Sequence, residues 1–549
     1  MNAILKILYL PLIFFYNELS ILEKKIFKKN RIKFKTKYLK KIINLNNSLK
    51  HEIKSKNLIL VESLVEHPAY IIKNLILANH LRKISNCEII LLINENDTYA
   101  KLIAKSFGIK RIFFFKQPNI FQRIKNFCII SRAFIKLKNI KDLLKLKFKG
   151  TFIGVSAYDL TLREKKLGTY NKIDHNIFYF LLKFINASDF FYNFFKNNKV
   201  KYFILDEIQF YPNSNLFQSA LKNKINCYVK AGNRKNITLR KYNNINKCFE
   251  NDSKFSKKLI YSLYNSKNKK KFISDGYKSM NSRIYGVPKK GDIKDAVHFK
   301  KGNLISKKSF YKKFNWDQTK PIGLILANDL TDGVTQRSWS LFRDNLSWLK
   351  FLLNNIKQNN NVNWIVKIHP SDYTKSLKFG TKYFFNSIIG TQKHVKLLPG
   401  KINARSLYKI VNFVFSSHGS AGLEYPFFKI PCVTSAESLY SDFGFTYECK
   451  TLTELKKIIQ NPLKIKQINK NIHDLLCVYL DIYINRTKIE IGMPDFNPFK
   501  NINYNKFNKV AYNYFKRKII YKSKFHNAFH SQTKNSYRHT IDFSDLSQI

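Results

Sequence analysis

The sequence predicts an α/β protein with two Rossmann-like domains, a helical linker between them and a helical tail. The 549 residues exceed one usual hydrophobic core, and a hydrophobic content of 44% is sufficient for packed interiors. Short apolar segments of strand length also alternate with segments of helical periodicity in two separate regions. This alternation is typical of parallel sheets covered by helices on both faces.

The first alternation begins at Asn57, after an apolar and basic segment, and defines an N-terminal domain over residues 57–240. Apolar, β-branched runs bounded by turn residues predict its strands. Strands are expected at 57–65, 87–94, 111–115, 150–160, 200–212 and 226–231, and helices at 68–83 and 97–109.

The pattern degrades after about residue 236, where polar, lysine-rich sequence predicts a helical linker over 241–320. A second domain is expected at 321–450 and a helical tail at 451–549. Its clearest helix is expected at 338–358, because apolar residues recur there every three or four positions. These positions are Trp339, Phe342, Leu346, Leu349, Leu353 and Ile356. Strands are expected at 321–328, 363–368, 395–400, 412–417 and 430–435, and helices at 404–411 and 420–428.

Residues 1–56 allow two interpretations. The segment opens with MNAILKILYLPLIFFYNEL, which is apolar but includes Lys6 and Pro11, and continues as a strongly basic stretch. One interpretation is an interfacial anchor on an anionic inner leaflet. The other is an ordinary first helix packed on the protein.

The net charge of +62, from 98 basic and 36 acidic residues, ordinarily suggests nucleic acid, an anionic membrane or an acidic substrate. Lysine, asparagine, isoleucine, phenylalanine and tyrosine share AT-rich codons, so codon bias accounts for much of the lysine. The shortage of acidic residues keeps contact with anionic lipid or sugar open. Lysine is spread along the whole chain without a helix-turn-helix, zinc or RNA-binding signature, so no nucleic-acid partner is expected. Seven scattered cysteines predict neither disulfides nor a zinc site and fit a reducing cytosol.

Ligands of open α/β sheets bind at the carboxyl ends of the strands, and three such ends in the second domain carry polar residues. The first loop contains Asn328, Asp329, Asp332 and Gly333. The second contains Lys367 and His369, which alternate along a strand and so can share one side, and then Pro370, which ends the strand. Together Lys367 and His369 can contact a phosphate.

The third strand end combines small and hydroxyl residues with a helix start, a combination that suits an anion. Its residues are Ser416, Ser417, His418, Gly419, Ser420 and Gly422, followed by Glu424 in the first helical turns. A carboxylate there can accept hydrogen bonds from ribose hydroxyls. An exposed glutamate that only favours the helix dipole explains its position equally.

The segments WIVKIHPSD and FVFSSHGSAGLEYPFFKIPCV resemble the capsule polysaccharide biosynthesis family of bacterial glycosyltransferases. They are also similar to GT-B enzymes that use CMP-activated sugars, such as sialyl- and Kdo-transferases. The resemblance implies two domains that face a central cleft and a nucleotide-sugar substrate with no cofactor and no metal. It implies a lipid- or glycan-linked acceptor and a cytoplasmic location, peripheral to the inner membrane.

By the same resemblance, His369 with Ser416 and Ser417 holds the donor phosphate, and Glu424 holds the nucleotide ribose. Asp332-Gly333 corresponds to the acidic loop of these enzymes and His369-Pro370 to their HP motif.

An inverting transferase also needs a general base to activate the acceptor hydroxyl. In GT-B enzymes this base often comes from the first domain. Asp159 is our first candidate, and Asp206 and Glu207 follow; Glu62 and His67 also lie near expected strand ends. A paired carboxylate can raise the pKa of its neighbour.

Four other functions are alternatives to a glycosyltransferase. A polyol-phosphate transferase or a nucleotide-sugar epimerase would have the same architecture. A basic nucleic-acid-binding protein and a non-catalytic scaffold come from other classes. The sequence contains no D-x-D, Walker A, G-x-G-x-x-G or H-E-x-x-H motif, which disfavours GT-A, NTPase, redox Rossmann and zinc-protease sites.

Overall fold

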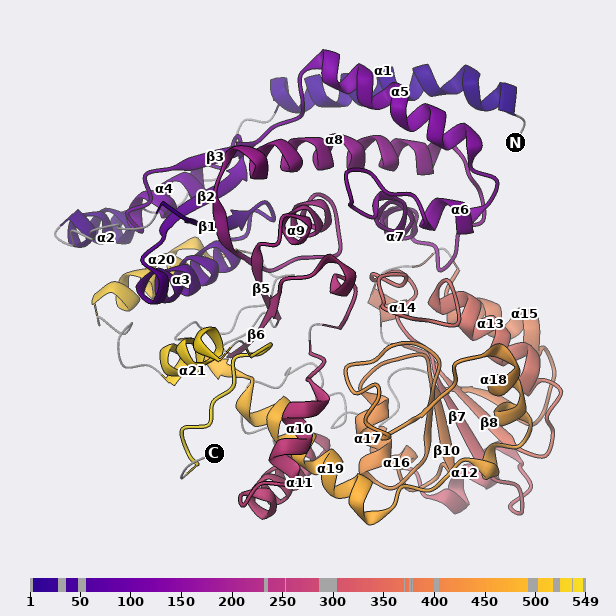
Figure 1. Ribbon diagram of the computed structural model, residues 1–549. Coiled ribbons are helices and arrows are strands. Elements are labelled where there is room, and N and C mark those ends of the chain that lie inside the picture. The colour runs from indigo at the N-terminus through magenta and orange to yellow at the C-terminus, as the bar shows by residue number, and fades with distance from the viewer. Residues whose placement is uncertain are drawn as a thin grey trace. The chain divides into compact units, whose positions relative to one another are not determined.

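The computed structural model forms two compact units (Figure 1). It describes residues 3–27, 36–47, 56–231, 236–251, 253–285, 304–369, 371–374, 377, 379–398, 404–491, 502–516, 524–535 and 537–546. Unit 1 comprises Met1–Thr161, Asn171–Cys248 and Ile489–Asp542, and unit 2 comprises Leu162–Tyr170, Phe249–Lys488 and Phe543–Ile549. The segment that we expected as one helical tail, 451–549, is therefore divided between both units.

Unit 1 is built on a seven-stranded sheet of order β13-β6-β5-β4-β1-β2-β3. Its strands are β1 (Leu58–Ser63), β2 (Glu88–Asn94), β3 (Ile112–Phe115), β4 (Val200–Leu205), β5 (Asn226–Ala231), β6 (Asn236–Tyr242) and β13 (Ile489–Glu490). The five strands from β5 to β3 are parallel, which confirms the predicted Rossmann-like pattern. Ile59, Leu91 and Leu75 are fully buried in its core.

The antiparallel edge of this sheet was not expected from the sequence. β6 runs antiparallel to β5, and the short β13 pairs antiparallel with β6. The segment of β6, NITLRKY, is polar and carries Arg240, which is 2% exposed and lies over the ring of Tyr242 at 4.3 Å. Because the buried arginine is polar, the sequence of β6 shows no apolar pattern from which a buried strand could be predicted.

The helices of unit 1 include those that connect the parallel strands and two from the C-terminal part of the chain. They are α1 (Ala3–Phe27), α2 (Lys37–Asn47), α3 (Pro68–Ser85), α4 (Thr98–Ser106), α5 (Ile120–Lys136), α6 (Ile140–Leu144), α7 (Ile153–Lys165), α8 (His175–Asn197), α9 (Asn213–Lys222), η1 (Ile245–Lys247), α20 (Tyr504–Lys516) and α21 (Lys524–Lys534). α7 continues into the first residues of unit 2.

The strand expected at 150–160 is wrong, because this segment forms the start of α7. Residues 153–162 are all buried, so this part of the helix has no solvent-exposed face that a polar periodicity would mark. A helix buried on all sides carries the same uninterrupted apolar run as a buried strand. Gly154 explains the close packing: a Cβ there would lie 1.8 Å from the carbonyl oxygen of Leu143 on α6.

Unit 2 contains a fully parallel six-stranded sheet of order β12-β11-β10-β7-β8-β9. Its strands are β7 (Ile322–Leu326), β8 (Asn363–Lys367), β9 (Val395–Leu398), β10 (Phe413–Ser416), β11 (Cys432–Thr434) and β12 (Tyr447–Glu448). The second Rossmann-like unit is thus also confirmed. Trp364 on β8 and Leu349 are fully buried in its core.

The helices of unit 2 include three in the expected linker region. They are α10 (Lys257–Tyr264), α11 (Lys269–Ile284), α12 (Lys307–Phe314), α13 (Asn345–Ile356), α14 (Ser371–Thr374), α15 (Thr381–Ile389), α16 (Ala404–Leu407), α17 (Ala421–Phe427), α18 (Leu452–Gln460), η3 (Pro462–Lys464), α19 (Lys470–Asp481) and η4 (Ile482–Arg486). Within the described ranges, no helix combines the length and the apolarity needed to cross a membrane.

The helix expected at 338–358 is shorter than predicted. α13 starts at Asn345, where the carboxylate of Asp344 accepts a hydrogen bond from the backbone N–H of Ser347 at 2.7 Å. Aspartate is a favoured N-cap because its oxygen satisfies a first-turn N–H. Trp339 and Phe342 lie in the loop before this cap, so their helical spacing was coincidental.

Candidate functional site

Three neighbouring strands of unit 2 bring the predicted loops together. β10 pairs with β7 and β7 with β8, and their registers match Ser416 with Leu326 and Leu326 with Lys367. Because parallel strands end at the same edge of a sheet, the loops after these three residues meet there. This proximity was expected from the sequence.

The three loops enclose a pocket of about 430 Å³. It is lined by Leu326, Ala327, Asn328, Asp329, Asp332, Asn345, Lys367, Ile368, His369, Ser416, His418, Gly419, Ser420 and Ala421. Among the predicted site residues, Gly333, Ser417 and Glu424 do not line it. Pro370 lies outside the described residues.

His418 is held neutral inside a network of donors. Arg337 donates from Nη2 to His418 Nε2, and Asn328 Nδ2 donates to the His418 carbonyl at 3.0 Å. An arginine has no acceptor, so His418 Nε2 carries no proton. Burial, and then the charges of Arg337 and His369, lower the pKa of His418 well below its ordinary value. The positive charge of this pair therefore belongs to Arg337, which contacts the lining residue His418 without lining the pocket itself.

Sequence reasoning missed Arg337. It lies in the loop between β7 and α13, which has no periodicity that would reveal a function. The signal available was an arginine, in a chain whose cations are mostly lysine, four residues after the Asp332-Gly333 pair.

The tautomer of His369 follows from its hydrogen bonds. The backbone N–H of Ser371 donates to His369 Nδ1 at 3.2 Å, and the Ser371 hydroxyl lies 2.6 Å from the same nitrogen. Nδ1 is thus an acceptor, and the neutral ring carries its proton on Nε2. A histidine in this state can donate one hydrogen bond to an anionic ligand.

Lys367 supplies a second cation beside His369. Burial lowers the pKa of Lys367, and the charge of Glu424 opposes that shift. A lysine with partly desolvated charge favours an anionic partner, because such a partner restores the interaction lost from water. Lys367 and His369 thus give the pocket wall a cation and a hydrogen-bond donor, two groups that suit an anionic ligand.

The glycines of the third loop have different roles. Gly419 has φ +137°, a conformation that L side chains rarely adopt, and it lines the pocket. Gly422 serves packing instead, because a Cβ there would lie 2.1 Å from the hydroxyl oxygen of Tyr440.

The start of α17 was expected to bind an anion through its free N–H groups. These groups are engaged inside the chain: Gly422 N–H donates to the Gly419 carbonyl at 3.3 Å, and those of Leu423 and Glu424 donate to the Ser420 carbonyl. The first turn thus closes on itself.

Glu424 is buried at 7% exposure, so it is not the exposed helix residue considered above. Tyr408 donates to its Oε2 at 3.0 Å, and Arg283 on α11 lies 3.8 Å from its Oε1. Its role toward a ribose stays a prediction. The observed contacts tie α11 to the base of the β10–α17 loop.

Asp332 and Ser417 lie at the margins of the site. The side chain of Asp332 is half exposed and pairs with Arg163 at 3.8 Å. Gly333, the next residue, has φ +57°, a left-handed conformation that favours glycine. The hydroxyl of Ser417 lies 3.1 Å from His418 Nδ1 and can orient that ring.

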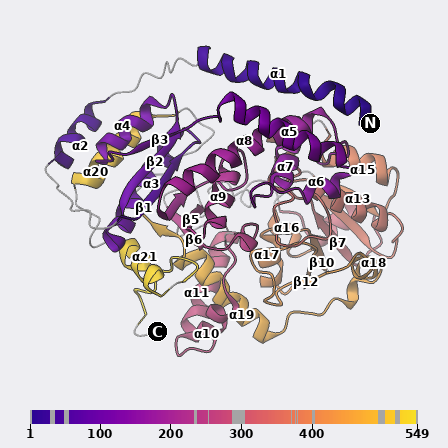
Figure 2. The ribbon, with the colours of Figure 1, turned by 45° about the horizontal axis from the view of Figure 1, so that its top comes forward.

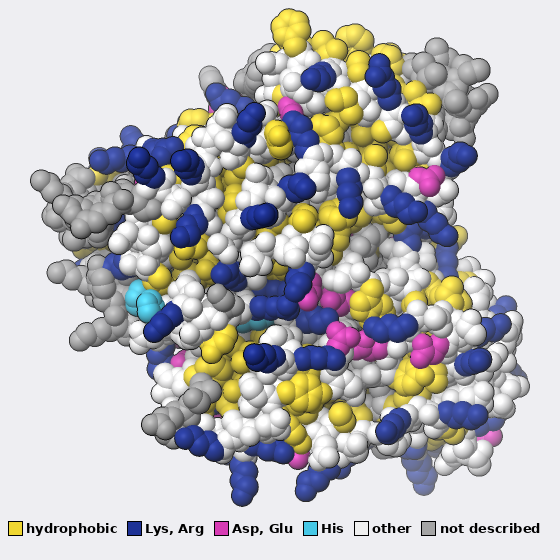
Figure 3. Space-filling view, in the orientation of Figure 1, with side chains coloured by type: hydrophobic (Ala, Val, Ile, Leu, Met, Phe, Trp, Pro, Cys, Tyr) yellow, Lys and Arg dark blue, Asp and Glu magenta, His cyan; other side chains and the backbone are white. Residues whose placement is uncertain are grey.

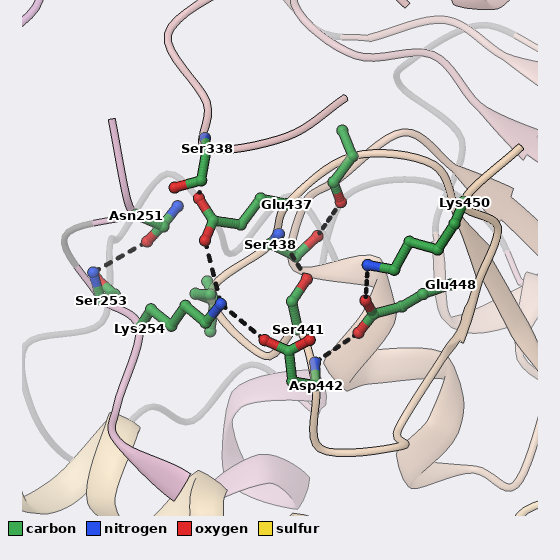
Figure 4. Close-up of polar contacts among 12 residues, drawn as sticks. Asn251, Ser253, Lys254, Ser338, Glu437, Ser438, Ser441, Asp442, Glu448 and Lys450 are labelled. Atoms are coloured by element: carbon green, nitrogen blue, oxygen red, sulfur yellow. Dashed lines mark hydrogen bonds and ion pairs between the residues drawn. The ribbon is translucent and has the colours of Figure 1, made fainter. Parts of the chain in front are cut away.

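A second network fixes the loop that follows β11 (Figure 4). Lys254 pairs with Glu437 at 3.1 Å and with Asp442 at 2.9 Å. Tyr440, between these two acids, donates its hydroxyl to the Gly419 carbonyl at 2.7 Å. The ion pairs therefore hold the loop that carries Tyr440, and Tyr440 in turn holds Gly419 of the pocket.

Unit 1 gathers charged groups at the carboxyl ends of its central strands. Asp206, directly after β4, forms an ion pair with Lys230 of β5, and the side chain of Lys230 is fully buried. Glu62 on the adjacent β1 is 1% exposed and accepts from Leu64 N–H at 2.8 Å. Burial, and then the charge of Asp206, raise the pKa of Glu62 to about 7.

The remaining base candidates differ in accessibility. Asp159 lies inside α7 at 1% exposure, not at a strand end. Glu207 is half-buried and accepts from the backbone N–H of Gln209 at 2.6 Å. His67 caps α3 by accepting from Ala69 N–H at 3.1 Å, and burial lowers its pKa to about 4. Glu207 is the most accessible of these carboxylates.

Among the residues that the structure describes, no three or more histidine, cysteine, aspartate or glutamate side chains form a group suited to a metal ion. The pocket is lined by lysine and histidine side chains, which are groups that bind phosphates directly.

No family model matches the chain, and no curated protein matches it by sequence. Solved structures with similar folds include KpsC of Thermosulfurimonas dismutans, described as a beta Kdo 2,4 transferase, with 11% identity over 57% of this chain and 88% of that chain and a TM-score of 0.35. A glycosyltransferase from Rickettsia africae has 10% identity over 85% and 100% of the two chains, with a TM-score of 0.25. UDP-GlcNAc 2-epimerase from Neisseria meningitidis, bound to UDP-GlcNAc, has 10% identity over 77% and 97%, with a TM-score of 0.23.

Proposed function

We propose that this chain is a glycosyltransferase of the GT-B type that moves a sugar from a nucleotide donor to a lipid- or glycan-linked acceptor in the assembly of a surface polysaccharide. The observation that carries the proposal is the pocket of unit 2. Lys367 and His369 line it with a cation and a hydrogen-bond donor at the carboxyl ends of parallel strands, where nucleotides bind in such folds. Arg337 lies behind the lining residue His418. His369 and Ser416, which by resemblance match the HP and serine motifs of the capsule polysaccharide family, also line this pocket.

In this proposal the pocket binds the donor phosphates and stabilises their charge as the sugar leaves. Arg337 and Lys367 supply positive charge, and His369 donates from Nε2 to a phosphate oxygen. These groups offset negative charge that develops on the leaving phosphate, which is where preorganised donors accelerate transfer most. Catalysis then proceeds without a metal. CMP-activated sugars are the first donors to test.

The acceptor hydroxyl would be deprotonated by a carboxylate of unit 1. Asp206 is already neutralised by Lys230, and Glu62 is too buried to touch an acceptor. Glu207 combines a strand-end position with an accessible carboxyl group, so we place it first and keep Asp159 as the alternative. Glu62, with a pKa of about 7, can exchange a proton with this cluster near neutral pH.

The test begins with thermal-shift measurements of the full chain against CMP, CDP, UDP and GDP, with a polynucleotide as control. One nucleotide should raise the unfolding temperature, and the polynucleotide should not. A response to the polynucleotide alone would favour the nucleic-acid hypothesis.

Calorimetry with the active nucleotide then tests the pocket. Lys367→Gln and His369→Ala should each weaken binding about tenfold or more, because each removes a charge or a hydrogen-bond donor from the pocket wall. Lys307→Gln, an exposed change on α12, should leave affinity unchanged. Unchanged affinity in both pocket variants would contradict the assignment.

A nucleotide-sugar epimerase or a polyol-phosphate transferase would use the same phosphate contacts. Turnover of a nucleotide sugar without any acceptor would favour the epimerase and exclude the transferase.

A further inference from the structure

The outer face of α1 is apolar at helical spacing. Leu12, Phe15, Tyr16, Leu19 and Leu22 are exposed by 52% to 68%. Their intervals of three and four residues place them along one side of the helix. Isolated exposed hydrophobic residues are ordinary, but five in one stripe form a surface that water solvates poorly.

The opposite face of α1 already has its partners. Leu10 and Asn17 are buried, Phe14 packs on Phe127 of α5 with ring centroids 4.9 Å apart, and Glu18 forms an ion pair with Arg123. α1 therefore lies fixed along α5 (Figures 1 and 2). The exposed apolar stripe is therefore separate from the face by which α1 packs on the protein.

α5 extends the exposed apolar surface. Ile120, Phe121, Ile124 and Ile129 are exposed by 39% to 80%. In Figure 3, hydrophobic side chains gather over the region of α1 and α5, and lysine and arginine side chains lie among them. We call the stripe of α1 and these four residues of α5 the α1–α5 surface.

Positive charge accompanies this surface. Lys125, Arg132 and Lys136 are exposed on α5. In the sequence, the segment that follows the stripe, KKIFKKNRIKFKTKYLKK over 24–41, contains ten basic residues and no acidic one. Three of those lysines, at positions 37, 40 and 41, are exposed on α2. Within the described part of α1, the acids are Glu18, which pairs with Arg123, and Glu23.

We propose that the α1–α5 surface docks on an anionic lipid bilayer, with the apolar stripe in the headgroup region and the basic side chains on the lipid phosphates. An apolar stripe gives only marginal binding by itself, and a polybasic segment is the second signal that makes it stable. Both signals are present here in consecutive segments of one chain. This inference does not depend on the proposed transfer reaction.

A second copy of the chain is a poorer occupant. Pairing two α1–α5 surfaces would bring the exposed Lys125, Arg132 and Lys136 of two α5 helices together, and like charges at an interface oppose association. An anionic bilayer instead offers a charge of the opposite sign to every exposed lysine.

The test measures co-sedimentation of the full chain with vesicles of phosphatidylcholine alone and of phosphatidylcholine mixed with phosphatidylglycerol. Binding should require phosphatidylglycerol and weaken with salt. The triple variant Leu12→Ser, Phe15→Ser, Leu19→Ser should bind at least about tenfold more weakly, because it removes the inserted groups. Lys125→Gln, Arg132→Gln, Lys136→Gln should lose roughly a hundredfold, at about fivefold for each basic side chain.

Matched controls come from exposed positions on unit 2. Leu463→Ser changes a leucine that is 69% exposed, and Lys307→Gln, Lys308→Gln, Lys312→Gln removes three exposed lysines of α12. Neither control should change vesicle binding, and all variants should keep the parent unfolding temperature because the altered side chains are exposed.

Three results would overturn the proposal. The first is equal loss of binding in the control and surface variants, which would indicate attraction by net charge alone. The second is vesicle binding that survives both surface variants. The third is a lipid-free dimer in sedimentation velocity that the serine variant converts to monomer, without vesicle binding by the parent chain.

Discussion

Glu62 should make the stability of unit 1 depend on pH, and Glu62→Gln should remove that dependence. In the folded chain the pKa of Glu62 is raised to about 7 from an ordinary value of 4.5, first by burial and second by the charge of Asp206. A carboxyl group with a raised pKa stabilises the fold fully while it is protonated in both states. That stabilisation is lost as pH rises through the folded pKa.

The expected magnitude follows from the two pKa values. A pKa of about 7 against 4.5 corresponds to about 3 kcal/mol in the free energy of unfolding. Glutamine stays neutral and resembles the protonated carboxyl group in shape. The variant should therefore match the parent near pH 4.5 and exceed its stability by up to about 3 kcal/mol near pH 8.

Denaturant unfolding at a series of pH values measures this difference. Glu95→Gln is the matched control, since Glu95 lies after β2 with its side chain half exposed and its pair to Lys116 at 3.5 Å is solvated. The control should shift stability by less than about 1 kcal/mol at every pH. A Glu62→Gln difference that is constant with pH, or that shrinks as pH rises, would refute the reasoning.

Three further results are expected. Lys230→Met leaves the Asp206 carboxylate buried without its cation, so the free energy of unfolding at pH 7 should fall by about 3–5 kcal/mol in denaturant titrations. Gly422→Ala places a methyl group 2.1 Å from the Tyr440 hydroxyl oxygen and should cost about 1–3 kcal/mol in the same assay, whereas an unchanged midpoint would mean that Tyr440 moves aside freely. Glu207→Gln should abolish sugar transfer and spare nucleotide affinity, and loss of turnover in Asp159→Asn with retention in Glu207→Gln would restore Asp159 as the base.

The sequence predicted the central parallel strands well because these are short apolar runs that are buried on both faces. Leu58–Ser63 and Asn363–Lys367 are examples, and their ends located the pocket loops. The same rule failed at Ile153–Lys165, where the helix is buried on every side over residues 153–162. Burial alone does not distinguish the two, and the close approach at Gly154 depends on α6, which no local pattern reveals.

Side-chain partners were the part of the site that sequence reasoning could not reach. The neutral state of His418 depends on Arg337, which is 81 residues away in the chain. The burial of Glu424 depends on Tyr408 and on Arg283 from the linker region. The order of the strands is enough to predict that the three loops meet. The pairing of charged and polar side chains within those loops depends on residues far apart in the sequence and is visible only in the folded chain.

The discontinuity of unit 1 has a consequence for the order of synthesis. β13 closes the edge of the sheet on β6, and α20 contributes Asn508, which accepts a hydrogen bond from Tyr99 at 2.8 Å. These partners belong to Ile489–Asp542, which a ribosome translates only after the whole of Phe249–Lys488. Unit 2 can thus complete its sheet during synthesis before unit 1 does, because β13, the last strand of unit 1, is translated later.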